Sequence, residues 1–197
     1  MESVNLLSQI LSTDNSVRQR AEADMNTKRT QDPASLMQLF VENLKNSDPQ
    51  TAQMACVLFK KYFLDNTEGF DPSNFEQMGT AVIESIDPSQ PMVLLKSKGD
   101  LISKICMLQG KSDELLAMLQ KWAQEDNSVF QQLAMYVSQK QTECHLTVDQ
   151  LKAYTERYFA IFQKCLGGSD LKVRVTSIPA ITSFLLSAKD DDDKNAV

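Results

Sequence analysis

The stretch Asp14-Asn15-Ser16-Val17-Arg18-Gln19-Arg20-Ala21 begins with an aspartate, has a β-branched residue three positions later and a small residue seven positions later. Three other segments repeat this pattern or come close to it: Asp48 to Ala55, Asp126 to Leu133, and Asp170 to Ser177. An aspartate at a helix N-cap accepts hydrogen bonds from the first free N–H groups. The third and seventh positions after it lie one turn apart on one side of the helix. The pattern therefore predicts four helices that each begin at an aspartate and bury one stripe.

The recurrence of these aspartates predicts a repeat protein. Asp87-Pro88 is a weaker fifth copy, because Leu94 lies seven positions on but Gln90 stands three positions on. The aspartates occupy positions 14, 48, 87, 126 and 170, so the intervals are 34, 39, 39 and 44 residues. Such intervals are typical of two-helix repeats of the HEAT or armadillo kind. Asp32-Pro33 and Asp71-Pro72 would start the intervening helices, because proline is tolerated at the first helical position.

Apolar side chains at i, i+3 and i+4 mark the first helix of each pair. We therefore predict an all-α fold, a right-handed α-solenoid of about five HEAT-like antiparallel helix pairs over residues 1–188. Each pair would bury its apolar face by stacking on its neighbours. The alternative is one irregular helical bundle. The expected pairs are 2–12 with 15–30, 33–46 with 49–65, 72–86 with 91–108, 113–124 with 127–142, and 148–166 with 170–187.

Composition limits the classes of function. The chain has 197 residues, 42% of them hydrophobic, with a formal charge of −6. This mild acidity disfavours direct nucleic-acid binding, which needs a basic surface. No apolar run approaches the ~18 residues of a membrane span, so membrane insertion is not expected. The charged run Lys189 to Lys194 fits a natural acidic linker, a loop or an artificial cleavage sequence, and residues 189–197 are set apart from the repeats.

Candidate catalytic residues are few. The four cysteines lie far apart without a paired spacing, so we expect reduced, mostly buried thiols and no metal site. Cys144 and the single histidine, His145, are adjacent, but neighbouring loop residues rarely face each other. No glycine-rich phosphate loop or cofactor motif is present. We therefore predict no enzyme activity and no cofactor; an enzyme would need an unrecognised site near His145 or the cysteines.

Three segments carry a family resemblance. They are Leu6 to Glu22, with its Asp14-Asn15-Ser16-Val17-Arg18 core, Gln53 to Lys61, which ends in a basic pair, and Asn127 to Ser138. The chain resembles the N-terminal region of the importin-β (karyopherin-β) superfamily, particularly its importin-5-like members. The resemblance covers about the first 140 residues well and the remainder loosely.

The resemblance implies a nuclear import receptor that shuttles between cytoplasm and nucleus. In that family the first repeats bind the GTP form of the small GTPase Ran through second helices lining the inner curve. The complete arch carries cargo proteins with basic localisation signals and touches phenylalanine–glycine nucleoporins, and Ran binding lowers cargo affinity by changing the pitch of the arch. Mapped onto this chain, the Ran-binding candidates are Arg20, Met54, Lys60 and Lys61.

Simpler interpretations remain open for these residues and for the chain. Lys60 and Lys61 fit ordinary solvated helix charges, and Met54 fits a core position. A rival function is a structural HEAT scaffold in a vesicle coat, a phosphatase complex or a kinase complex.

Overall fold

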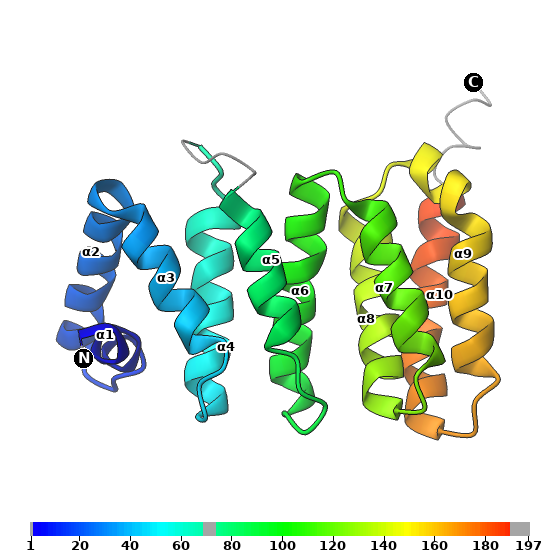
Figure 1. Cartoon of the computed structure of the whole chain (residues 1–197), viewed down its shortest axis with the longest axis horizontal. Helices are drawn as coiled ribbons and strands as arrows, with labels where there is room; N and C mark the ends of the chain where they lie inside the picture. The colour runs from blue at the N-terminus through cyan, green and yellow to red at the C-terminus, as the bar shows by residue number, and fades with distance from the viewer. Residues whose placement is uncertain (1, 69–73, 190–197) are drawn as a thin grey trace. The chain divides into compact units, whose positions relative to one another are not determined.

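The computed structural model describes residues 2–68 and 74–189, whose regular structure consists of ten α-helices and one π-helical turn (Figure 1). No strand occurs within these two ranges. The chain forms two compact units, residues 1–101 and 102–197. The predicted all-α class and its antiparallel helix neighbours are confirmed.

The first unit contains five helices, one π turn and the start of a sixth helix. Within it α1 packs on α2, and α3 packs on α4. From α2 to α5 successive helices run in opposite directions, whereas α1 is seen end-on (Figure 1). The fully buried side chains of its core include the rings of Phe40, Phe59, Phe63 and Phe75. Its elements are α1 (Glu2–Ile10), α2 (Asn15–Gln31), α3 (Pro33–Asn43), α4 (Pro49–Phe59), the π turn η1 (Lys60–Leu64), α5 (Asn74–Glu84) and the beginning of α6 (Met92–Leu108).

The second unit contains the end of α6 and four further helices. In it α7 packs against α8 and α9, and α10 lies against both α8 and α9. Tyr158, Phe162 and Phe184 form an aromatic cluster between α9 and α10. The helices are α7 (Ser112–Gln124), α8 (Ser128–Cys144), α9 (Val148–Leu166) and α10 (Leu171–Lys189).

Three of the five repeat-motif aspartates cap helices as predicted, and Asp32 caps α3, where its carboxylate accepts from the amide of Ser35 at 3.1 Å. The Asp14 carboxylate accepts from the amide of Ser16 at 2.8 Å, and the Asp48 carboxylate accepts from the amide of Thr51 at 3.0 Å. The Asp170 carboxylate accepts from the amide of Lys172 at 2.7 Å at the start of α10. Hydrogen bonds from the Ser16 hydroxyl, the Thr51 hydroxyl and the Val173 amide contribute most to lowering the pKa of Asp14, Asp48 and Asp170, respectively. These caps are therefore ionised at neutral pH.

The prediction that Asp126 caps a helix is wrong by one residue. Asn127 is the N-cap of α8, with extended backbone angles, and its Oδ1 atom accepts from the amide of Val129 at 2.9 Å. Asparagine and aspartate are about equally favourable at the N-cap position, so the residue types alone do not decide between Asp126 and Asn127 as the cap of α8. The start predicted at Asp71 lies outside the described residues.

Asp87 does not start α6, contrary to the fifth-copy prediction. Its carboxylate accepts from the amide of Ser89 at 2.8 Å, and its carbonyl accepts from the amide of Gln90 at 2.9 Å, which closes a turn. Gln90 precedes Pro91, and a residue before proline is disfavoured in the helical region. The helix therefore begins only at Met92. At the other end of the chain, α10 continues through Pro179, which lies inside the helix.

Candidate partner-binding surface

A solvent-facing patch lies on α4 and the first residues of η1. We call it the α4 patch, and it consists of Gln53, Met54, Val57, Lys60 and Lys61. Val57 is half exposed, at 50%, and Lys61 is exposed, whereas Met54 and Lys60 are partly exposed. Val57 is the centre of the patch, because residues three and four positions away on a helix are its surface neighbours. The opposite side of α4 is buried in the core of the first unit.

The π turn determines how the chain continues beyond this patch. In η1 the amide of Asp65 donates to the carbonyl of Lys60 at 2.9 Å, which is a bond spanning five residues. The wider turn accommodates one more residue than an α-helical turn. As a result Tyr62, Phe63 and Leu64 are all buried in succession, while Lys60 and Lys61 face solvent.

Aromatic packing holds η1 in place. The Phe63 ring stacks on the Phe59 ring at a centroid distance of 5.4 Å and meets the Phe40 ring edge-on at 6.1 Å. The Phe40 ring also lies 6.3 Å from the ring of Tyr62. On the outer side, the Lys61 ammonium lies 5.6 Å from the centroid of the Tyr62 ring, within cation–π range. The two lysines therefore project from a well-packed base.

The end of α2 is tied to the chain just after η1. The Arg29 guanidinium donates to the carbonyl of Asn66 at 3.2 Å. Burial raises the pKa of Tyr62, and the Glu22 carboxylate raises it further, while Arg29 lowers it in part. Glu22 and Arg29 thus mark the side of α2 that faces η1.

The structure brings three of the four candidate residues together and leaves one apart. Met54, Lys60 and Lys61 share the α4 patch. Arg20 is exposed on α2, nine residues before Arg29. At 3.6 residues per turn this separation places Arg20 about 180° around the helix from Arg29, on the side away from η1. Arg20 therefore does not belong to the α4 patch.

Sequence reasoning missed Val57. A valine inside an apolar helix segment is ordinarily assigned to the core. The available signal was its position three and four residues before two consecutive lysines, which marks the polar side of the helix.

The cysteines have the properties of structural residues. Burial raises the pKa of Cys56 to about 12, and Lys98 opposes that shift only in part. Burial also raises the pKa of Cys106 and of Cys165 to about 11. Since the thiolate is the nucleophilic form, these three thiols are poorly reactive at neutral pH. Cys144 is exposed at the end of α8, and the backbone amide of its neighbour His145 donates to the carbonyl of Gln141 at 3.0 Å.

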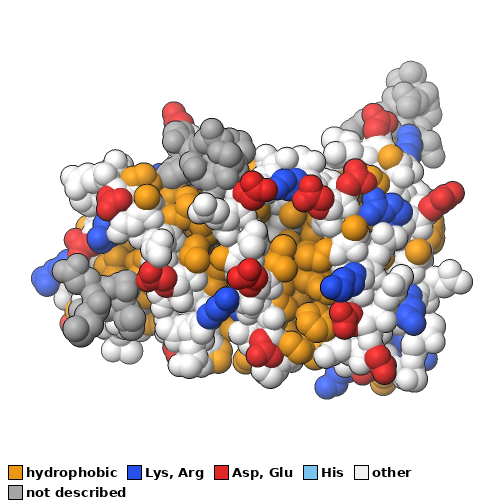
Figure 2. Space-filling model, viewed as in Figure 1, with side chains coloured by type: hydrophobic (Ala, Val, Ile, Leu, Met, Phe, Trp, Pro, Cys, Tyr) orange, Lys and Arg blue, Asp and Glu red, His pale blue; other side chains and the backbone are white. Residues whose placement is uncertain are grey.

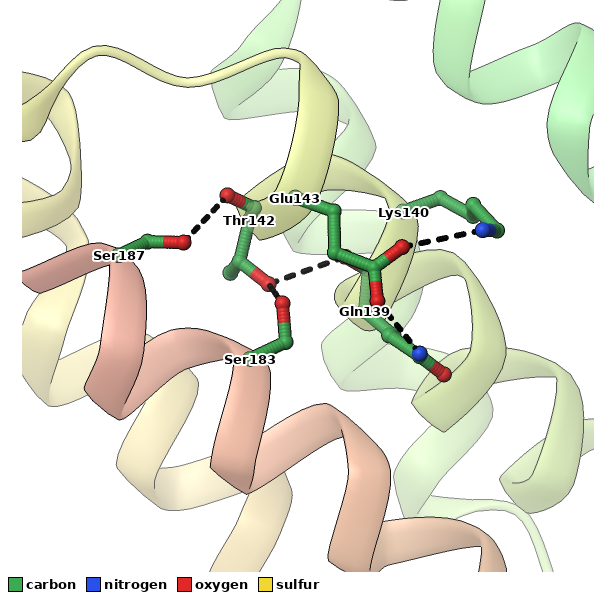
Figure 3. A network of polar contacts seen from close by, with 6 residues as sticks. All are labelled: Gln139, Lys140, Thr142, Glu143, Ser183 and Ser187. Carbon is green, nitrogen blue, oxygen red and sulfur yellow. Dashed lines mark hydrogen bonds and ion pairs between the residues drawn. The ribbon is translucent and has the colours of Figure 1, made fainter.

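A polar network joins α8 and α10 in the second unit (Figure 3). The hydroxyl groups of Thr142 and Ser183 lie 2.8 Å apart, and the Ser187 hydroxyl donates to the Thr142 carbonyl at 2.9 Å. Beside them, burial alone would raise the pKa of Glu143, but hydrogen bonds from Gln139 and Lys140 outweigh it and lower that pKa. These bonds link two helices and satisfy buried hydroxyl groups, so we assign the network a structural role.

The surface charges are mixed. On the face shown in Figure 2, acidic and basic side chains are interspersed among the described residues, without a field of one sign. Within the same residues no group of three or more His, Cys, Asp or Glu side chains is arranged to hold a metal ion. None of the described helices combines the length and the apolar character that crossing a membrane requires.

Comparison with known proteins identifies the fold class of these helices. The structure of importin beta, crystallised in an ammonium sulfate condition, matches with a TM-score of 0.77 and 17% sequence identity. The match covers 99% of this chain and 25% of importin beta, so the chain spans about a quarter of that protein's length. No protein-family model matches the sequence, and no curated protein matches it. At this identity the likeness defines an importin-beta-like HEAT fold.

Proposed function

We propose that this chain is the Ran-GTP-binding part of a nuclear import receptor. The observation that carries the proposal is the match of nearly the whole chain to importin beta. The arrangement of Met54, Lys60 and Lys61 in one exposed patch on a second helix of a helix pair supports it. In the importin-β family, which the sequence resembles, the second helices of the first repeats bind the GTPase.

The complete receptor would carry cargo proteins with basic localisation signals through the nuclear pore and contact phenylalanine–glycine nucleoporins on the way. Binding of Ran-GTP to this part would lower cargo affinity through small rotations between helix pairs. The receptor would accordingly shuttle between cytoplasm and nucleus, and the present chain would supply its GTPase-responsive part.

The deciding experiment is a titration of the chain with Ran locked in its GTP form and in its GDP form. We expect clear binding to the GTP form and much weaker binding to the GDP form. Affinity should fall as the salt concentration rises, because exposed charges are screened over about 10 Å at 0.1 M salt. Equal binding to both forms, or binding to neither, removes the receptor proposal and leaves the structural scaffold as the better interpretation.

A charge-reversal variant links the binding to the α4 patch. The double variant Lys60→Glu/Lys61→Glu should slow association and weaken Ran-GTP binding, because rim charges chiefly steer encounter. The double variant Lys121→Glu/Lys172→Glu makes the same charge change at two exposed lysines on α7 and α10 in the second unit and serves as the control. Equal effects of the two variants would show that net charge matters and the α4 patch does not.

A further inference from the structure

We infer that Val57 is the apolar anchor of the α4 patch, and that its partner surface presents an apolar side chain flanked by carboxylates. The inference rests on the proposed function, since the partner is taken to be the GTPase. It adds a residue that was not among the four Ran-binding candidates, and it specifies the chemistry that the bound surface must offer.

Val57 lies at the centre of the exposed side of the patch. Its side chain is half exposed, whereas Ala55, Cys56 and Leu58 around it are buried. One turn earlier lie Gln53 and Met54, and one turn later lie Lys60 and Lys61. Val57 is therefore an apolar centre with an amide and a thioether on one side and two ammonium groups on the other. Binding energy concentrates in such a centre when the polar surroundings exclude water from it.

The patch is held rigidly by the residues that pack beneath it. Valine has a restricted χ1 angle, so little side-chain entropy is lost when a partner covers it. Phe59 and Phe63 anchor the backbone on either side of the lysines by stacking in the core. Single π turns inside helices are rare and occur frequently at functional sites. Here the π turn begins at Lys60, directly at the edge of the patch.

The charge of the patch is positive on one side of Val57. Lys60 and Lys61 place two positive charges within one turn of Val57. The two ammonium groups need anionic partners when a protein covers the surface, because a desolvated charge without a partner is costly. The covering surface must therefore combine an apolar contact for Val57 with at least one carboxylate.

The test uses substitutions at position 57 and Ran in its GTP form. Val57→Ser should weaken binding about tenfold, the usual scale for loss of an interface anchor. Ile83→Ser is the matched control, because Ile83 is 42% exposed on α5 of the same unit and lies outside the patch. The control should bind like the wild type. Circular dichroism should give the same helix content for both variants.

A pair of charged variants tests the partner chemistry. Val57→Lys and Val57→Glu both remove the apolar contact and introduce a long charged side chain. An acidic partner should bind Val57→Lys at least several-fold more tightly than Val57→Glu, and high salt should reduce that difference.

The outcomes separate this inference from the proposed function. If the wild-type chain does not bind Ran-GTP selectively, the proposed function and the inference both fall. Selective wild-type binding with Val57→Ser unchanged within about twofold overturns the anchor role alone. Weak binding by Val57→Ser with equal binding by the lysine and glutamate variants overturns the acidic partner surface.

Discussion

Asp48 shows how one carboxylate starts a helix. It accepts hydrogen bonds from the amides of Gln50 and Thr51 and from the Thr51 hydroxyl, the last at 2.6 Å. The Thr51 hydroxyl contributes most to lowering the pKa of Asp48, followed by the Thr51 amide. A carboxyl group whose pKa is lower in the folded protein than in the unfolded chain stabilises the fold above the unfolded pKa of 3.8. That contribution is lost as the pH falls through the folded-state value.

We therefore predict that the unfolding free energy of the wild type depends on pH differently from that of Asp48→Asn. Asparagine also caps helices well, so the two proteins should have similar unfolding free energies near neutral pH. Asparagine does not titrate, so the wild type should lose more stability than the variant between about pH 5 and about pH 3. Urea unfolding at the two pH values measures the difference. Equal losses of unfolding free energy in the two proteins would show that Asp48 has the same pKa in the folded and unfolded states.

Lys98 is a fully buried amine in the first unit. Its ammonium donates to the Ser85 carbonyl at 2.5 Å and to Gln90 Oε1 at 3.0 Å, which fastens the turn before α6. Burial lowers the pKa of Lys98, and Cys56 and Asp87 offset this lowering only in part. Lys45 adds to the lowering.

The sign of the resulting pH dependence is opposite to that of Asp48. Between the lowered folded-state pKa and 10.5, the unfolded chain binds more protons at Lys98 than the folded chain does. The unfolding free energy of the wild type should therefore rise with pH in this window relative to that of Lys98→Met, which lacks the titrating group. Urea unfolding of wild type and Lys98→Met at about pH 8 and about pH 10 measures this rise in relative unfolding free energy. A difference in unfolding free energy between the two proteins that stays the same at both pH values would contradict the prediction.

At the scale of elements, the π turn depends on one aromatic cluster. The Phe40 ring contacts Phe59, Tyr62 and Phe63 and is completely buried. Phe40→Ala should lower the unfolding free energy by about 3–5 kcal/mol, the usual cost of deleting a buried aromatic ring. Phe159→Ala, at a ring that is 49% exposed on α9, should cost clearly less. Urea unfolding gives both values, and equal losses would mean that the Phe40 site collapses around the smaller side chain.

The helices were predictable because local signals agree with one another. Aspartates 14, 48 and 170 cap helices, and the residue seven positions beyond each is buried. The range predicted for the second helix of the third pair, 91–108, agrees with α6 to within one residue. Asp87 does not cap this helix, because Pro91 stands between them. The π turn was not foreseen, although three consecutive buried residues at 62–64 cannot share one side of a regular α-helix.

The candidate surface was only partly predictable. The basic pair and Met54 are adjacent along one helix, so their proximity follows from spacing alone. The separation of Arg20 from them depends on which side of α2 faces η1, and that is set by the contact of Arg29 with Asn66. Such contacts between helices leave no periodic trace in the sequence.

At the scale of the whole molecule, the chain divides into two compact units, and a buried thiol lies in each. Cys56 is 1% exposed in the first unit, and Cys165 is completely buried in the second. Cys144 is the exposed cysteine, so a maleimide reagent should label it first in the native protein.

Native-state alkylation can therefore follow the two halves of the chain separately. Raising the denaturant concentration in small steps and locating the adduct by peptide mass spectrometry should show Cys56 and Cys165 becoming reactive as their own unit opens. Rapid alkylation of Cys56 without denaturant would contradict its burial. Each unit thus contains a buried cysteine whose alkylation reports when that unit opens, and no foreign probe has to be introduced.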